Sequence, residues 1–283
     1  MKASATLCFL LCVLPGLAVA KTSQATAQKE LEAVIHGAQR TPSFVARDKY
    51  RHPDATLTFF GIRPDMRVVE VLPGGGWYTE ILAPYLRDHG QLIEATPPQI
   101  GGSSFSRHMA AWFAHKLAGK PNVYGRVKLE PFELPNYMSL GAPDSADMVL
   151  TFRNMHDLIF SNVHGVTTDA MLQRFLHSAY QVLKPGGVLG IVAHRAKADM
   201  PPAKSHLLGR LPQAFVIKEA EEAGFRLAGI SEVNANPKDP RTFPVWYLPP
   251  SLAQKGKDRA KYESIGEADN MTLKFIKPGS SSK

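Results

Sequence analysis

The chain has 283 residues, of which 44% are hydrophobic and 20% are charged. This composition is typical of a globular protein, and the length suits one large domain or two small ones. No segment resembles a repeat array or a long low-complexity tract. The formal net charge of +8 favours anionic surfaces. The basic residues are dispersed and do not alternate with aromatic ones, so nucleic acid is not an expected partner.

The first 20 residues have the pattern of a secretory signal peptide. Lys2 is their only charged residue, residues 7–14 are almost wholly apolar, and Ala18-Val19-Ala20 forms a small-x-small cleavage site. The apolar stretch is too short for a good membrane span, although an uncleaved anchor is the alternative. We therefore expect a periplasmic or secreted protein with no stable membrane insertion after cleavage.

Both cysteines, Cys8 and Cys12, lie inside this leader. The mature chain would then have no disulfide, no cysteine nucleophile and no thiolate metal site. Loss of Lys2 leaves 32 of the 33 basic residues against 25 acidic ones, a charge of +7. We expect this charge to give solubility and weak attraction to anionic surfaces.

Hydrophobic periodicity predicts alternating strands and helices along the rest of the chain. Predicted strands cover residues 68–72, 92–95, 123–129, 148–152 and 188–193. Predicted helices cover residues 24–39, 78–86, 104–118 (with Met109, Trp112, Phe113 and Leu117 inward), 168–183 and 213–223. Two further strands, 225–233 and 242–248, have only a turn-rich segment between them and predict an antiparallel pair at the sheet edge.

These patterns divide the chain into four segments. The signal peptide covers residues 1–20, and an N-terminal helical cap covers residues 21–55. The main α/β domain covers residues 56–250. Residues 251–283 are charged and weakly patterned, and we expect a partly mobile C-terminal tail there.

Residues 68–86, VVEVLPGGGWYTEILAPYL, predict a strand, a glycine turn and a helix in succession. This arrangement forms a ligand crevice at the carboxyl end of a strand in open parallel sheets. Glycines allow a ligand to approach the backbone closely, and Glu70 on the strand could hold a polar ligand group. A tight turn with no ligand is the alternative interpretation.

Three segments together resemble the class I S-adenosylmethionine-dependent methyltransferase superfamily. They are VVEVLPGGG, ADMVLTFRNMHDL and LHSAYQVLKPGGVLGIVAH, and the resemblance covers roughly residues 60–250. The phrase PGGGWYTEILAPYL, with FFGI before it, is similar to an exported branch of predicted methyltransferases. The resemblance implies a Rossmann-like, seven-stranded, mostly parallel sheet with an antiparallel C-terminal hairpin, and it implies S-adenosylmethionine as cofactor.

The resemblance also implies cofactor-binding roles around the glycine turn. Glu70 matches the acidic residue that supports the ligand's amino-acid end. Gly74 and Gly76 match the second and third motif glycines, with Gly75 between them. Leu72 stands where the first glycine belongs, so we expect the turn to differ there.

Three more positions follow by register with the family. Thr96 stands where the family has an acidic residue for the ribose hydroxyls, and Glu94 lies two residues earlier. Either Glu94 substitutes for that residue or the ribose is held otherwise. Glu130 falls at the position of the acid that contacts adenine, and Asn154 falls in the loop that faces substrate.

The catalytic prediction rests on His156 and Asp157, in the same loop. A base is needed only if the methyl acceptor carries a proton, and histidine titrates near neutral pH. Asp157 could orient His156 or act alone, and the alternative is a hydrogen-bonded loop cap with no catalytic role. Arg195, after the fifth strand, could hold an anionic substrate group or lie at the surface.

Two aromatic residues are candidates for the pocket wall, and the histidines are candidates for metal ligands. Trp77 and Tyr78 follow the glycine turn and could wall the pocket or pack in the core. The ten histidines are scattered, and His108 and His115 are seven residues apart, unlike the i and i+4 spacing of zinc-binding helices. We therefore expect no metal site.

The sequence supports two functions of different classes. The first is a methyltransferase that acts on a small-molecule acceptor. The second is a non-catalytic small-ligand-binding protein on the same fold, which export favours because S-adenosylmethionine is made in the cytoplasm. A hydrolase is a third possibility, but no GxSxG nucleophile elbow is present. The sequence gives no indication of oligomeric state.

Overall fold

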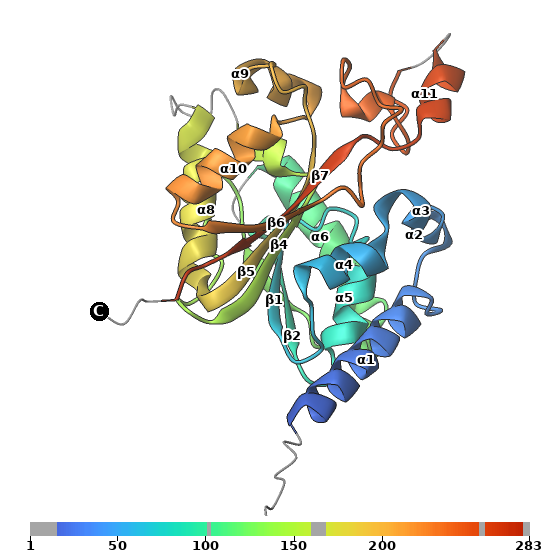
Figure 1. Ribbon diagram of the computed structural model, residues 1–283. Helices are drawn as coiled ribbons and strands as arrows, with labels where there is room; N and C mark the ends of the chain where they lie inside the picture. The colour runs from blue at the N-terminus through green and yellow to red at the C-terminus, as the bar shows by residue number, and fades with distance from the viewer. Residues whose placement is uncertain (1–15, 101–102, 160–167, 255–257, 280–283) are drawn as a thin grey trace, which may run out of the picture.

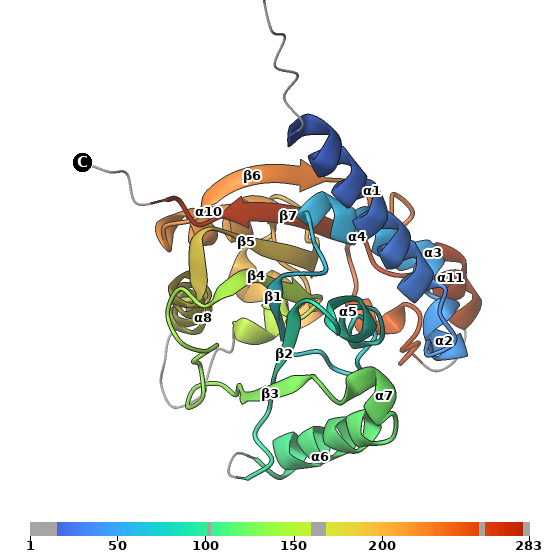
Figure 2. The same ribbon diagram turned by 90° about the horizontal axis from the view of Figure 1, so that it is seen from below.

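The computed structural model describes residues 16–100, 103–159, 168–254 and 258–279. Its strands form one seven-stranded sheet in the order β3-β2-β1-β4-β5-β7-β6, with helices on both faces (Figure 1 and Figure 2). Five neighbouring strands are parallel. They are β1 (Arg67–Val71), β2 (Gln91–Thr96), β3 (Lys128–Pro131), β4 (Ala146–Phe152) and β5 (Leu183–His194).

The last two strands form the antiparallel part of the sheet. β7 (Asn270–Ile276) pairs antiparallel with β5 on one side and with β6 (Arg226–Ser231) on the other. The predicted fold class is therefore confirmed: a mostly parallel α/β sheet with an antiparallel C-terminal pair.

Helices bury the sheet on both faces, which explains why the inner strands are almost continuously apolar. One face is covered by α1 (Gly16–Ile35), α4 (Pro53–Phe60) and α5 (Thr79–Leu86), and the other by α8 (Thr168–Val182) and α10 (Gln213–Glu222). Near β3 lie α6 (Ser104–Ala118) and α7 (Pro121–Tyr124). Short helices are α2 (Pro42–Val45), α3 (Asp48–Arg51), α9 (Pro202–Ser205), α11 (Arg259–Ile265), η1 (Met155–Leu158), η2 (His206–Leu208) and η3 (Val245–Tyr247).

The prediction of a strand at residues 242–248 is wrong. That segment contains η3, and Pro244 precedes it, because proline cannot donate to a strand ladder. The seventh strand is instead Asn270–Ile276, inside the predicted C-terminal tail. The sheet therefore extends past the predicted domain boundary at residue 250.

Two predictions around α6 and β3 also need correction. Residues 121–124 form α7, so β3 begins at Lys128 instead of residue 123. Pro121 at the first position favours that helix. Trp112 was predicted to face inward, but it is 46% exposed, while Phe113 beside it is buried.

The N-terminal part of the chain is helical, as the predicted cap requires. α1 ends at Ile35, and α2 and α3 lie in the polar segment that follows it. Most of the predicted signal peptide, residues 1–15, lies outside the described residues, so the leader stays a prediction. No helix in the described part of the chain is long and apolar enough to cross a membrane.

Candidate functional site

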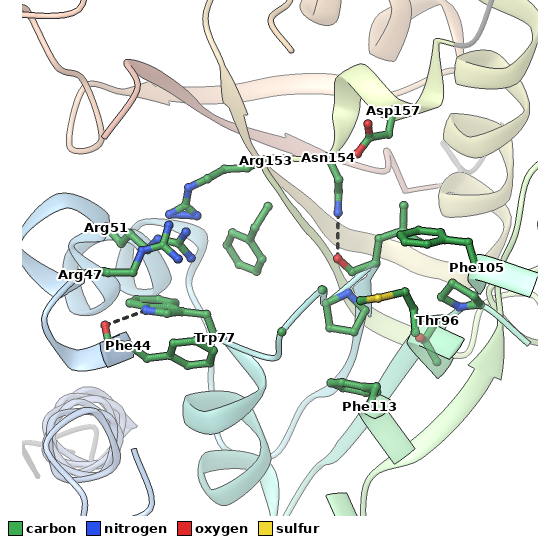
Figure 3. A pocket seen from close by; sticks show the side chains of 17 residues that line it. Phe44, Arg47, Arg51, Trp77, Thr96, Phe105, Phe113, Arg153, Asn154 and Asp157 are labelled. Carbon is green, nitrogen blue, oxygen red and sulfur yellow. Dashed lines mark hydrogen bonds between the residues drawn. The ribbon is translucent and has the colours of Figure 1, made fainter. Parts of the chain in front are cut away.

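A cavity of about 450 Å³ lies beyond the carboxyl ends of β1, β2 and β4 (Figure 3). Its volume is in the range of small-molecule pockets, roughly 300–1,000 Å³. The glycine turn after β1 lies at its centre. Thr96 and α6 line one end, and side chains from α2, α3 and the end of β4 line the other. This is the crevice expected at the carboxyl ends of parallel strands.

The glycine turn opens toward the cavity at Gly74. Gly74 has φ 56° and Gly76 has φ 77°, conformations that favour glycine. A Cβ at Gly74 would meet no atom within 4 Å, whereas a Cβ at Gly75 would lie 3.3 Å from the Phe44 ring. Leu72, where the family has a glycine, also adopts a left-handed φ of 54°, at a cost of about 1 kcal/mol. The backbone thus follows a glycine-type path despite the leucine.

Asn154 holds this turn in place. Its Nδ2 donates to the carbonyl oxygens of Val71 at 2.8 Å and Leu72 at 3.2 Å, and the Thr151 hydroxyl donates to its Oδ1. Asn154 is 6% exposed and also lines the cavity. Asn154 therefore fixes the turn, and its predicted cofactor-binding role stays a prediction.

The N-terminal cap is tied to the same turn. Lys116 Nζ donates to the Gly75 carbonyl oxygen and to Glu80 Oε1, both at 2.8 Å. Glu80 Oε2 accepts from the Thr41 backbone N–H at 2.7 Å. Burial would raise the pKa of Glu80, but the hydrogen bonds from Lys116 and Thr41 lower it overall. The segment that carries α2 and α3 is therefore held against the cavity.

Glu70 and Glu94 lie side by side on β1 and β2, where they are register partners. Both are buried, and neither lines the cavity. Burial raises the pKa of Glu70 to about 7, against the lowering effect of hydrogen bonds with Glu94 and Thr79. Burial, then the Glu70 charge, raises the pKa of Glu94 well above its usual value. These two carboxyl groups belong to the sheet interior beside α5.

Only some of the other predicted cofactor-binding residues line the cavity. Gly74, Gly75 and Asn154 line the cavity together. Gly76 does not line it, and a Cβ there would lie 3.1 Å from the Phe113 ring. Glu130, near the end of β3, is half-buried and also outside the lining. Thr96, at the end of β2, does line the cavity.

Only one of the two predicted catalytic residues lines the cavity. His156 Nε2 lies 3.3 Å from Asp157 Oδ1, but only Asp157 lines the cavity. The His156 ring instead lies 5.9 Å from the His194 ring. Burial lowers the pKa of His156 and raises that of Asp157, and in each case the partner's charge opposes the shift. The described residues contain no group of three or more His, Cys, Asp or Glu side chains arranged to hold a metal ion.

Trp77 and Tyr78 take one each of the two roles that the sequence left open. Trp77 lines the cavity, and its Nε1 donates to the Phe44 carbonyl oxygen at 2.9 Å. Tyr78 is buried and stacks on the Phe152 ring, with centroids 3.5 Å apart and planes at 13°. Arg195 forms an ion pair with Glu232 at 2.7 Å and does not line the cavity.

Sequence reasoning missed a cluster of three arginines at one end of the cavity, here called the arginine cluster: Arg47, Arg51 and Arg153 (Figure 3). Arg47 lies between α2 and α3, Arg51 ends α3, and Arg153 follows β4. Glu267 binds two of them, at 2.5 Å to Arg47 Nε and 3.2 Å to Arg51 Nε. The i and i+4 spacing of Arg47 and Arg51 was visible in the sequence, but their meeting with Arg153 was not.

Two members of the arginine cluster, Arg51 and Arg153, are strongly desolvated. Burial, then the charge of Arg153, lowers the pKa of Arg51 to about 9. Burial also lowers the pKa of Arg153. The Arg51 guanidinium lies 4.9 Å from the centroid of the Trp77 ring, which gives it a favourable cation–π contact.

No protein-family model matches the sequence, and no curated protein matches it. Solved structures do match in fold. A S-adenosylmethionine-dependent methyltransferase from Aquifex aeolicus matches at 17% identity and a TM-score of 0.51, covering 88% of this chain and 98% of its own. The [4+2]-cyclase SpnF matches at 16% identity and a TM-score of 0.52, covering 92% and 96%. The chain therefore has the class I methyltransferase fold.

Proposed function

We propose that the protein is an S-adenosylmethionine-dependent methyltransferase that acts on a small-molecule acceptor. The fold alone does not decide this, since one fold serves many chemistries and SpnF is a cyclase. The observation that carries the proposal is the glycine turn, which presents the open face of Gly74 to a cavity at the carboxyl end of β1. The Thr96 hydroxyl and the apolar side chains of Phe105 and Met109 line the same cavity.

The chain's residues suit the proposed cofactor in three parts of the cavity. Gly74 and Gly75 allow close backbone approach. Thr96 offers a hydroxyl where the family places its ribose-binding acid, and Phe105 and Met109 supply apolar surface beside it. When bound, S-adenosylmethionine supplies an electrophilic methyl group. The chain's task is then to hold the acceptor in line with it and to exclude water.

Proton removal, where the acceptor requires it, is assigned to Asp157. Its carboxyl group lines the cavity, and burial raises its pKa, which makes it a stronger proton acceptor than an exposed aspartate. His156 lies on the far side of Asp157, 3.3 Å away, and its charge state acts on Asp157 through that contact. The N-terminal pattern supports action in the periplasm or outside the cell.

The test is calorimetric titration of residues 21–283 with S-adenosylhomocysteine. We expect saturable binding that weakens at least tenfold in Gly74→Asn. Asparagine tolerates a left-handed φ, so this change mainly places a side chain in the cavity. Gly186→Asn is the matched control, because Gly186 also has a positive φ and open space around its Cβ position, at the amino-terminal part of β5.

Three outcomes would contradict this proposal. An absence of binding to the unsubstituted chain at millimolar ligand would exclude the cofactor. Equal weakening by Gly74→Asn and Gly186→Asn would show a general loss of stability instead of a cavity effect. Binding without methyl transfer to any acceptor would favour the non-catalytic ligand-binding protein.

A further inference from the structure

We infer that Arg47, Arg51 and Arg153 form a binding subsite for a carboxylate-like oxyanion at the end of the cavity opposite Thr96. The inference deepens the proposed function: the identity of the ligand rests on that function, while the subsite itself rests on the arginines. None of these three residues had been singled out by motif or by register.

The first observation is that the Arg153 side chain lacks a hydrogen-bond partner among the described residues. Its Nε, Nη1 and Nη2 are all buried, and none has a hydrogen-bond partner among the described residues. A buried guanidinium has five N–H donors, and leaving a charged group unpaired costs several kcal/mol. Arg153 lines the cavity and points toward Arg51 and Arg47 (Figure 3). A ligand oxyanion would satisfy donors that the protein leaves free.

The second observation is the local charge balance. Glu267 is the carboxylate that pairs with Arg47 and Arg51, through Oε1 to the first and Oε2 to the second. Both of its oxygens are therefore engaged. Three cations face one anion in this part of the described structure, and the Tyr78 hydroxyl nearby is also buried without a hydrogen-bond partner. All three arginines line the cavity.

The third observation is backbone strain at the same residue. Arg153 has φ 64°, a left-handed conformation that an arginine rarely adopts. Its backbone N–H donates to the Val192 carbonyl oxygen at 2.7 Å, which holds the residue in this conformation. Without this conformation, the Arg153 side chain would continue the alternation of side chains along β4. Backbone strain of this kind is concentrated at ligand-binding sites.

An oxyanion that offers two oxygens side by side fits this cluster best. A guanidinium presents paired N–H groups that match two oxygens of a carboxylate or a phosphate. The glycine turn separates the arginine cluster from the apolar end near Phe105 (Figure 3). The oxyanion could belong to the amino-acid end of the methyl donor or to an anionic methyl acceptor, and these two sources share the same chemistry.

The experiment compares the unsubstituted protein with Arg153→Met, and Arg226→Met serves as the control because Arg226 is exposed on β6. Three probes are used: S-adenosylhomocysteine, which has a carboxylate; 5′-methylthioadenosine, which lacks it; and inorganic phosphate. Nucleoside binding is measured by calorimetry. Phosphate binding is measured by the rise in thermal midpoint, with and without saturating S-adenosylhomocysteine.

Two results support the subsite and identify its source. If Arg153→Met weakens S-adenosylhomocysteine at least tenfold and leaves methylthioadenosine unchanged, the oxyanion belongs to the donor. If both nucleosides are unchanged, but phosphate stabilises the S-adenosylhomocysteine complex of the unsubstituted protein and not that of Arg153→Met, the oxyanion belongs to the acceptor. Arg226→Met behaves like the unsubstituted protein in both cases.

Other results separate this inference from the proposed function. If Arg153→Met binds all three probes as tightly as the unsubstituted protein does, the subsite is rejected. An unsubstituted protein that binds phosphate through Arg153 but binds neither nucleoside keeps the subsite and rejects the methyltransferase. We expect ligand-free Arg153→Met to have an equal or higher thermal midpoint, because an unpaired buried charge is removed. If it does not fold, Arg51→Lys is assessed by the same criteria, since lysine keeps the positive charge and lacks the paired N–H donors of a guanidinium.

Discussion

At the scale of single residues, Glu70 shows how strand geometry redirects a side chain from its predicted task. Side chains alternate along a strand, so Glu70 points to the opposite face of the sheet from Val69 and Val71. There its carboxyl group meets Glu94 and the Thr79 hydroxyl, which donates to it at 3.2 Å. The sequence identified an acidic residue before the glycine turn, but its burial depends on α5 and β2, which pack around it.

The carboxyl pair makes stability depend on pH. The folded pKa of Glu70, about 7, lies above its ordinary value of 4.5, so the folded state binds more protons than the unfolded state between these values. The unfolding free energy therefore falls as pH rises from about 4.5 to about 7. Glu70→Gln removes the part of this loss that comes from Glu70, and at pH 8 it should raise the unfolding free energy by roughly 3 kcal/mol.

Urea unfolding between pH 4.5 and pH 8 measures this effect. Glu70→Gln should flatten the decline, whereas Glu221→Gln, an exposed position on α10, should leave it unchanged. A decline of the same slope in Glu70→Gln would show that Glu70 is not its source.

The arginine cluster illustrates the opposite case, in which no local pattern could have found the site. Arg51 and Arg153 are 102 positions apart in the sequence, and Glu267 lies far beyond both. Only the folded chain brings these three residues together. By contrast, the glycine turn is one contiguous segment with its own backbone requirements, so it was predictable. Contiguous features of the site could be read from the sequence, while those assembled from distant segments could not.

At the scale of elements, β7 is the most informative error. The strand NMTLKFI alternates buried Met271, Leu273 and Phe275 with more polar residues, a period of two that predicts a strand. The charged residues before it, from Lys255 to Glu263, suggested a tail instead. The parallel strands β1, β2 and β4 were located closely because each is a short apolar run beside a turn signal.

Because β7 is an interior strand, shortening a side chain on its core face should have a large effect on stability. Leu273 is fully buried, so Leu273→Ala should lower the unfolding free energy by about 2–5 kcal/mol. Its register partner on β6, Ile230, is 45% exposed, and Ile230→Ala should cost much less. Guanidinium unfolding of both variants measures the difference. If Leu273→Ala loses no more unfolding free energy than Ile230→Ala, the placement of β7 between β5 and β6 is contradicted.

At the scale of the whole molecule, Glu267 joins two regions that are far apart in the sequence. It follows α11 and contacts Arg47 and Arg51 of the N-terminal segment. Burial alone would raise the pKa of Glu267, but the nearby arginines lower it overall. Its favourable contribution is therefore present at neutral pH and is lost as pH falls through the lowered pKa.

Loss of this carboxylate should strongly destabilise the protein. Glu267→Gln leaves three arginines without their anion, and removal of one partner of a buried pair costs about 3–5 kcal/mol. Glu263→Gln is the control, because its pair with Arg259, at 2.9 Å, is exposed and worth at most about 0.5 kcal/mol. Denaturant unfolding at pH 7 compares them, and similar losses for both would show that Glu267 has no special role.

The insertion of β7 between β5 and β6 fixes an order of events during synthesis. β5 and β6 both leave the ribosome before β7, yet neither can pair with the other, since β7 occupies the place between them. Until residue 276 has emerged, both strands keep an unpaired edge, and such edges recruit other chains. The nascent protein therefore completes its sheet only when β7 arrives, so protection of those edges must last at least until residue 276 has left the ribosome.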